Sequence, residues 1–159
     1  MTMNKTLGCF IAVVFLASCG TTGQRPATQS PEPSKFSYVR IYCTPDNESH
    51  FESVTTDLAR VDAAPPAQPF FAKGSSATRV AFAAFEAGWG SQDEKTEKFH
   101  PAPAAQYVVY LSGQMSITTS DGQTRRFGSG DVLRVEDVAP CKGHISEVGT
   151  DPVRTMVVR

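Results

Sequence analysis

The sequence has no excess of charge of one sign. Its 159 residues include 15 basic and 16 acidic side chains, which leaves a formal net charge of −1. A nucleic-acid-binding domain usually carries a clustered basic surface, and this balance excludes a strongly basic one. Charged residues make up 19% of the chain and hydrophobic residues 40%, which argues against a wholly disordered protein. The length fits one domain of ordinary size.

Long apolar runs are also absent. The run from Leu7 to Leu16 is shorter than the ~20 residues that a membrane-spanning helix needs. Lys5 precedes this run and Ser18–Cys19 follows it, which is the anatomy of a secretory signal peptide. The residues before the cysteine resemble a bacterial lipobox, which implies cleavage after Ser18 and lipid attachment at Cys19. The alternative is an ordinary secreted protein that is cleaved nearby.

We therefore expect three regions in the chain. Residues 1–18 form a lipoprotein signal peptide, 19–35 a lipidated flexible tether, and 36–159 the folded domain. The tether is dominated by Gly, Ser, Thr, Gln and Pro, so it buries too little apolar surface to fold. The lipid would hold the domain on a membrane of the bacterial cell envelope. Gly20 after the cysteine resembles lipoproteins of the outer membrane that face the periplasm.

Cysteine is scarce, with four in the whole chain. Cys9 leaves with the signal peptide and Cys19 becomes the anchor, so Cys43 and Cys141 remain in the domain. Thiols often pair in the oxidising compartment that an exported domain enters. The alternative is a buried small side chain at Cys43 and an exposed thiol at Cys141. The sequence leaves both open because it gives no Cα separation.

Helical periodicity is nearly absent from residue 36 onward, while alternation with period two and turn residues recur. About nine short strands are expected, at residues 36–43, 49–55, 78–85, 106–111, 115–119, 124–127, 131–136, 144–148 and 153–158. Prolines predict an irregular connection over 62–77. Asp121–Gly122 is typical of a hairpin turn, and we expect no further role for it. Short strands with frequent turns indicate a small all-β sandwich or barrel.

Two segments of the chain carry a family resemblance. His100–Gly113 and Gly130–His144 resemble the two motifs of the cupin superfamily, within a likeness that covers about residues 78–148. Together with Phe99 and the turn before His144, they resemble a subgroup of small single-domain bacterial cupins. The resemblance implies a cupin-type jelly-roll barrel, preceded here by the signal peptide and the disordered tether.

The resemblance also implies where a metal would bind. Cupin metal sites use two histidines and a glutamate from the first motif and one histidine from the second. Those positions hold His100, Ala102, Gln106 and His144, so two of the usual donors are missing. His50, the remaining histidine, could supply a third nitrogen if its strand lines the barrel mouth. A divalent transition metal (Fe, Zn, Ni or Mn) is one expectation, and the missing donors favour a barrel without metal.

The favoured prediction is a membrane-anchored cupin that binds an unidentified small molecule in its barrel. His100, Gln106 and His144 would be its few polar groups, with Trp89 at the mouth of the pocket. The main alternative is a metal-dependent enzyme, oxygenase-like or isomerase-like by family analogy alone. A further alternative is an envelope structural protein that forms a homodimer through its barrel faces. No nucleic-acid partner is expected, and the sequence indicates neither catalytic residues nor the ligand.

Overall fold

The computed structural model describes residues 32–90 and 99–159 of the chain. These residues form eleven strands and no helix, so the domain is all-β, as predicted. The strands are β1 Lys35–Cys43, β2 Ser49–Asp57, β3 Ala59–Val61, β4 Phe70–Ala72, β5 Val80–Phe85, β6 Gln106–Ser112, β7 Gln114–Thr119, β8 Thr124–Gly128, β9 Val132–Val135, β10 His144–Val148 and β11 Val153–Val158. Among the described residues, no segment forms a helix that could cross a bilayer.

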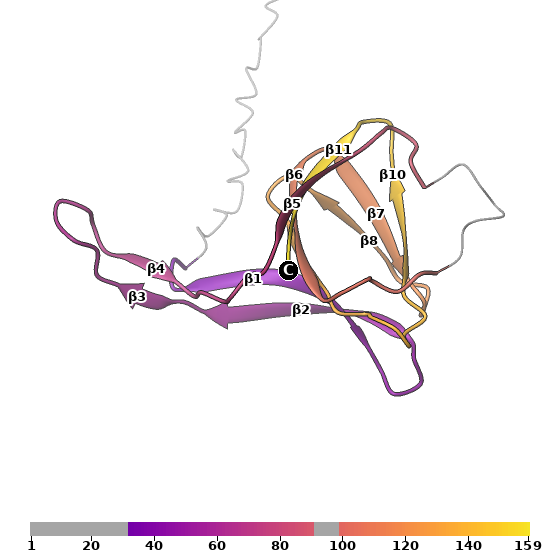
Figure 1. Ribbon diagram of the computed structural model, residues 1–159, viewed down its shortest axis with the longest axis horizontal. Coiled ribbons are helices and arrows are strands. Elements are labelled where there is room, and N and C mark those ends of the chain that lie inside the picture. The colour runs from indigo at the N-terminus through magenta and orange to yellow at the C-terminus, as the bar shows by residue number, and fades with distance from the viewer. Residues whose placement is uncertain (1–31, 91–98) are drawn as a thin grey trace, which may run out of the picture. The chain divides into compact units, whose positions relative to one another are not determined.

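The strands are arranged in a jelly-roll-like barrel (Figure 1). A six-stranded sheet has the order β2-β1-β9-β6-β11-β5, and a three-stranded sheet has the order β10-β7-β8. The pairing of β1 with β9 is parallel, and the other pairings are antiparallel. The predicted jelly-roll arrangement is confirmed at the level of these two sheets.

The core forms where alternating side chains of the two sheets meet. On β7, Met115 and Ile117 are buried, and on β9, Leu133 and Val135 are buried, each pair at the spacing of two that a strand requires. Tyr110 on β6 joins them in the same cluster of buried residues. The sequence predicts this alternation, because successive side chains of a strand point to opposite faces.

Two strands lie where the sequence did not predict them. β3 and β4 pair with each other, Val61 opposite Phe70 and Ala59 opposite Ala72, and form a separate two-stranded sheet. In Figure 1 this hairpin continues the line of β2 and extends away from the barrel. The expected irregular connection over 62–77 is therefore wrong at 70–72. Prolines flank this pairing without interrupting it, because they lie in the loop between the two strands.

Several predictions fall on residues outside the described ranges. All described residues belong to one compact unit of the chain, Pro31–Arg159. The signal peptide at 1–18, the lipid site at Cys19 and most of the tether at 19–35 lie outside the described residues. β1 begins at Lys35, one residue before the expected start of the domain.

Candidate functional site

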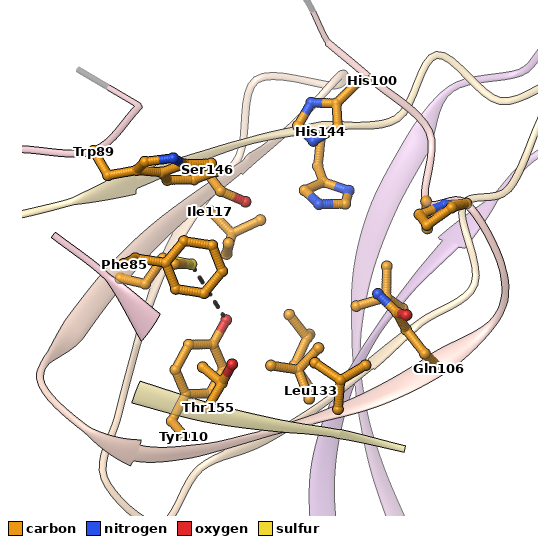
Figure 2. A pocket seen from close by; sticks show the side chains of 16 residues that line it. Phe85, Trp89, His100, Gln106, Tyr110, Ile117, Leu133, His144, Ser146 and Thr155 are labelled. Atoms are coloured by element: carbon orange, nitrogen blue, oxygen red, sulfur yellow. Dashed lines mark hydrogen bonds between the residues drawn. The ribbon is translucent and has the colours of Figure 1, made fainter. Parts of the chain in front are cut away.

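A cavity of about 210 Å³ opens between the two sheets. Its wall is mostly apolar and comes from β5, β6, β7, β9, β10 and β11, together with the segments that lead into β6 and out of β5. Trp89, His100, Gln106 and His144, the four residues predicted to bind a ligand, all line it (Figure 2). The structure thus brings these four side chains together, and ligand binding itself stays a prediction.

A buried carboxylate orients the imidazole of His144. The Nδ1 atom of His144 lies 2.7 Å from Oδ2 of Asp137, whose side chain is 0% exposed. A carboxylate accepts hydrogen bonds, so this contact places a proton on Nδ1 and directs the ring. Nε2 is then the ring atom that can bond with a ligand. Sequence reasoning did not assign Asp137 to the site; it lies two residues after the end of β9, in the turn before His144.

Backbone pairing holds His100 beside His144. The two residues form an antiparallel bridge, with His100 N donating to His144 O at 3.1 Å and His144 N donating to His100 O at 3.0 Å. Their ring centroids are 5.1 Å apart. Ala102 N also donates to the carbonyl oxygen of Asp137, at 3.1 Å. The segment 100–102 is therefore attached to both ends of the loop that carries the Asp137–His144 pair.

This close approach requires a glycine at residue 143. Gly143 has a φ of +91°, in the left-handed region, and a Cβ there would overlap the backbone carbonyl of His100. The loop from Asp137 to Gly143 therefore turns His144 toward the cavity without a steric clash.

Gln106 differs from the glutamate that the cupin resemblance places at its position. Its Oε1 accepts a hydrogen bond of 2.8 Å from Nε of Arg159. Because that oxygen already has a partner, the group that Gln106 offers to the cavity is its Nε2 amide, a hydrogen-bond donor. The side chain therefore suits a ligand acceptor better than a metal ion.

Aromatic side chains line one side of the cavity. Phe85 and Trp89 lie with ring centroids 4.8 Å apart, and Trp89 is 43% exposed. Below Phe85 in Figure 2, the buried Tyr110 donates a weak hydrogen bond to Sδ of Met115 at 3.8 Å. Burial raises the pKa of the Tyr110 phenol well above its usual range, and the charge of Asp131 adds to the shift. This hydroxyl is therefore neutral under ordinary conditions.

His50 lies elsewhere, so the three histidines do not converge. On β2, Ser49 and Phe51 point into the barrel and are buried, which sends His50 to the opposite face of the sheet. Its Nδ1 lies 2.8 Å from Oδ2 of Asp121, and its Nε2 lies 3.2 Å from Oγ1 of Thr44. Asp121 thus has a second role besides the turn, contrary to our expectation. His50 is not among the residues that line the cavity.

The donor set present does not match the cupin metal site. His100 and His144 supply two imidazoles, Ala102 supplies no donor, and the oxygen of Gln106 is bonded to Arg159. Within 32–90 and 99–159, no group of three or more His, Cys, Asp or Glu side chains is placed to hold a metal ion. The described residues therefore do not fit a complete site.

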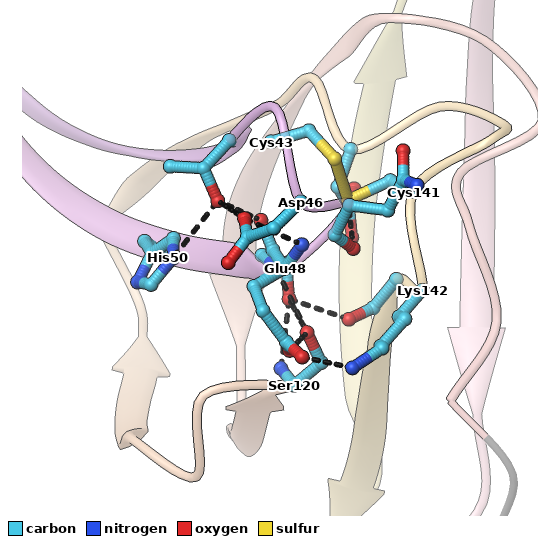
Figure 3. The surroundings of a disulfide bond; sticks show 12 residues. Cys43, Asp46, Glu48, His50, Ser120, Cys141 and Lys142 are labelled. Atoms are coloured by element: carbon cyan, nitrogen blue, oxygen red, sulfur yellow. Dashed lines mark hydrogen bonds and ion pairs between the residues drawn. A yellow bond between two sulfur atoms is a disulfide. The ribbon is translucent and has the colours of Figure 1, made fainter.

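A disulfide joins Cys43, at the end of β1, to Cys141 in the loop between β9 and β10 (Figure 3). The Cα atoms are 5.9 Å apart and the residues are 98 positions apart in the sequence. Beside it, Lys142 forms an ion pair with Glu48, and Ser49 Oγ donates to the carbonyl oxygen of Gly143 at 2.6 Å. These contacts hold the loop that positions Asp137 and His144.

Comparisons with known proteins found a structural similarity but no sequence match. No family model matches the sequence, and no curated protein matches it. One solved structure that matches is a putative ethanolamine utilization protein Q from Salmonella typhimurium LT2, with 13% sequence identity and a TM-score of 0.33. The match covers 77% of this chain and 94% of that chain. A TM-score this low carries no argument, so the description of the fold rests on the strands and sheets themselves.

Proposed function

We propose that this chain is a cupin-type protein that binds a small molecule in its barrel cavity. The observation that carries the proposal is the pairing of His144 with the fully buried Asp137 at the edge of a mostly apolar cavity. Ligand sites in proteins are typically apolar concavities with a few oriented polar groups. An imidazole held by a buried carboxylate is such a group, because its orientation is set before a ligand arrives.

The cavity opens to solvent, and its volume indicates how much of a ligand the barrel can hold. An engineered cavity of roughly 150 Å³ holds one benzene molecule. The described wall of this one encloses about 210 Å³, enough for a single ring with one or two substituents. His144 Nε2 and the Gln106 amide would bond with polar atoms of the ligand, while Trp89 and Phe85 would contact its apolar surface.

Native mass spectrometry of the chain as purified from its host tests this proposal. We expect a small bound molecule that is released on denaturation and is lost in a His144→Ala variant. The matched control is His50→Gln, which alters an imidazole outside the cavity and should keep the molecule. A bound molecule that persists equally in both variants would contradict binding at this site.

The alternative is a metal-dependent cupin enzyme. The observation in its favour is the Asp137–His144 pair, because metal-binding histidines usually donate their second ring nitrogen to a carboxylate or carbonyl. The incomplete donor set counts against it. Elemental analysis of protein purified without chelators separates the two proposals, since near-stoichiometric metal that His144→Ala removes would support the enzyme.

We also propose that Cys19 carries lipid and holds the domain at the outer membrane, facing the periplasm. The support is the sequence of residues 1–20 alone. A Cys19→Ser variant should move from the membrane fraction to the soluble fraction, because several acyl chains on one residue provide the membrane affinity. A variant that still partitions with membranes would contradict the anchor.

A further inference from the structure

Two arginines lie opposite each other at one end of the strand pair β5–β11. Arg79, just before β5, and Arg159, just after β11, exchange backbone hydrogen bonds with N···O distances of 3.2 Å and 2.9 Å. Residues paired in this way project their side chains from the same face of a sheet, with Cα atoms about 5.5 Å apart. That face is the cavity side, because Thr155 and Val157 line the cavity and Arg159 continues their spacing of two.

A second hollow, of about 150 Å³, adjoins the cavity at this point. It is lined by Arg79, Ala81, Gln106, Val157 and Arg159. Gln106 and Val157 also line the cavity, so they form the border between the two spaces. In Figure 2, Gln106 lies across the cavity from the aromatic side chains of Phe85 and Trp89. The hollow therefore extends the binding space on the side away from the aromatic wall.

The positive charge of this hollow is not balanced by a described carboxylate. None of the described residues that line the hollow is acidic, and no ion pair within 32–90 and 99–159 includes Arg79 or Arg159. The main-chain oxygen of Arg159 accepts hydrogen bonds from the N–H groups of Thr78 and Arg79. Like charges at directly opposite positions destabilise a sheet. An anion held between the two guanidinium groups would remove this repulsion.

Gln106 connects the arginines to the cavity. Its Oε1 accepts a hydrogen bond of 2.8 Å from Nε of Arg159. The Nη groups of that guanidinium and the Nε2 group of the amide are then the N–H donors that a ligand can use. Guanidinium donors match the planar geometry of a carboxylate, and hydrogen bonds between two charged groups are stronger than those between neutral ones. This donor set favours a carboxylate over a neutral polar group.

We propose that the ligand of the barrel is a small carboxylic acid, bound as its carboxylate by Arg79, Arg159 and Gln106. The apolar part of the acid would enter the cavity and contact the aromatic wall at Phe85 and Trp89. This inference rests on the proposed function and adds the chemical class of the ligand. It also gives the two opposed arginines a binding role that the cavity residues alone do not supply.

Binding of model compounds to the purified full chain tests the inference. Phenylacetate, phenylpropionate and phenylbutyrate each join a ring to a carboxylate through a spacer of different length. Their primary amides have nearly the same shape without the charge. We expect calorimetry to show that an acid of this series binds about tenfold or more tightly than its amide, because the charge strengthens its hydrogen bonds.

An arginine variant then locates the binding of the carboxylate. Arg79→Gln removes an exposed charge and should raise the Kd of the acid about tenfold or more, while the Kd of the amide stays the same. The matched control is Arg154→Gln. It removes the same charge from β11, where Arg154 is exposed and alternates with the cavity-lining Thr155. This control should leave both dissociation constants unchanged.

An acid that binds no more tightly than its amide would overturn the inference, and so would equal effects of the Arg79 and Arg154 variants. If none of the compounds binds, the molecule released from the native protein decides. A carboxylate that both Arg79→Gln and His144→Ala lose would support the inference. A molecule without a carboxylate, or one that only His144→Ala loses, would contradict it and leave small-molecule binding intact. If the native protein also carries no molecule, the proposed function fails and this inference fails with it.

Discussion

The Nδ1 atom of His144 lies 2.7 Å from Oδ2 of Asp137, and that carboxylate has no exposed surface. The two residues lie seven positions apart, on either side of a loop that the Cys43–Cys141 disulfide attaches to the end of β1. The pair therefore links the geometry of the cavity to the stability of the fold. The predictions below separate these two contributions.

Asp137→Ala should lower the free energy of unfolding by about 1–3 kcal/mol, since it leaves the buried Nδ1–H of His144 without its hydrogen-bond acceptor. Glu136→Ala is the matched control. Glu136 is the residue before Asp137, and its own carboxylate forms partly exposed ion pairs with Arg40 and Arg134. Such pairs contribute about 1 kcal/mol or less. Urea denaturation of both variants provides the measurement, and equal losses would contradict a special role for Asp137.

Gly143→Ala should destabilise the protein more than Gly130→Ala. Both glycines have nearly the same left-handed conformation, with φ of +91° and +92°. A side chain in that region costs about 1–2 kcal/mol in itself. At residue 143 the added Cβ would also overlap the backbone of His100, whereas nothing lies within 4 Å at residue 130. The difference between the thermal unfolding midpoints of Gly143→Ala and Gly130→Ala measures the effect of the steric clash. Equal midpoints would show that the loop moves to relieve the clash, and would contradict the prediction.

Replacing both Cys43 and Cys141 by serine should lower the free energy of unfolding by about 2–5 kcal/mol, the usual cost of losing a disulfide that closes a long loop. Wild-type protein unfolded with and without a reductant should show a loss of similar size. A reductant should have no effect on the double variant. Wild-type stability that does not change with reductant would contradict the prediction.

Asp121 should make the protein sensitive to acid. Burial by itself would raise the pKa of Asp121, but hydrogen bonds from Thr119, the Gln123 backbone and His50 outweigh it and lower the pKa. A group with a lowered pKa in the folded state contributes stability above its unfolded pKa of about 4, and this contribution disappears as the pH falls through the folded pKa.

Asp121→Asn should therefore be less stable than the wild type near pH 7, and the difference should shrink as the pH falls below about 4 and through the lowered folded pKa. Denaturant unfolding across this range gives the comparison. Asp151→Asn, on the exposed loop between β10 and β11, is the control for removing one carboxylate. If the difference in free energy of unfolding between the wild type and Asp121→Asn grew as the pH fell, the predicted sign would be wrong.

Much of the fold could be predicted because its signals are local. The alternation of Met115 and Ile117, and the turn at Asp121–Gly122, each require only a few consecutive residues. Trp89, His100, Gln106 and His144 were placed around one pocket through the family resemblance, and the structure puts them there. Asp137 was missed because its role depends on a loop that folds back over seven residues.

The β3–β4 hairpin was missed for a related reason. Each strand has three residues, too few for alternation to stand out from the prolines that lie between them.

The amino-acid sequence by itself determined the all-β class, the balanced charge and the positions of nine strands, because these follow from composition and from a period of two residues. Tertiary structure decided which imidazoles meet. His50 lies between Ser49 and Phe51, whose side chains enter the barrel, and one step along a strand reverses the direction of a side chain. The register of β2 against β1 therefore sends His50 outward to Asp121, while the bridge between residues 100 and 144 brings the other two rings together.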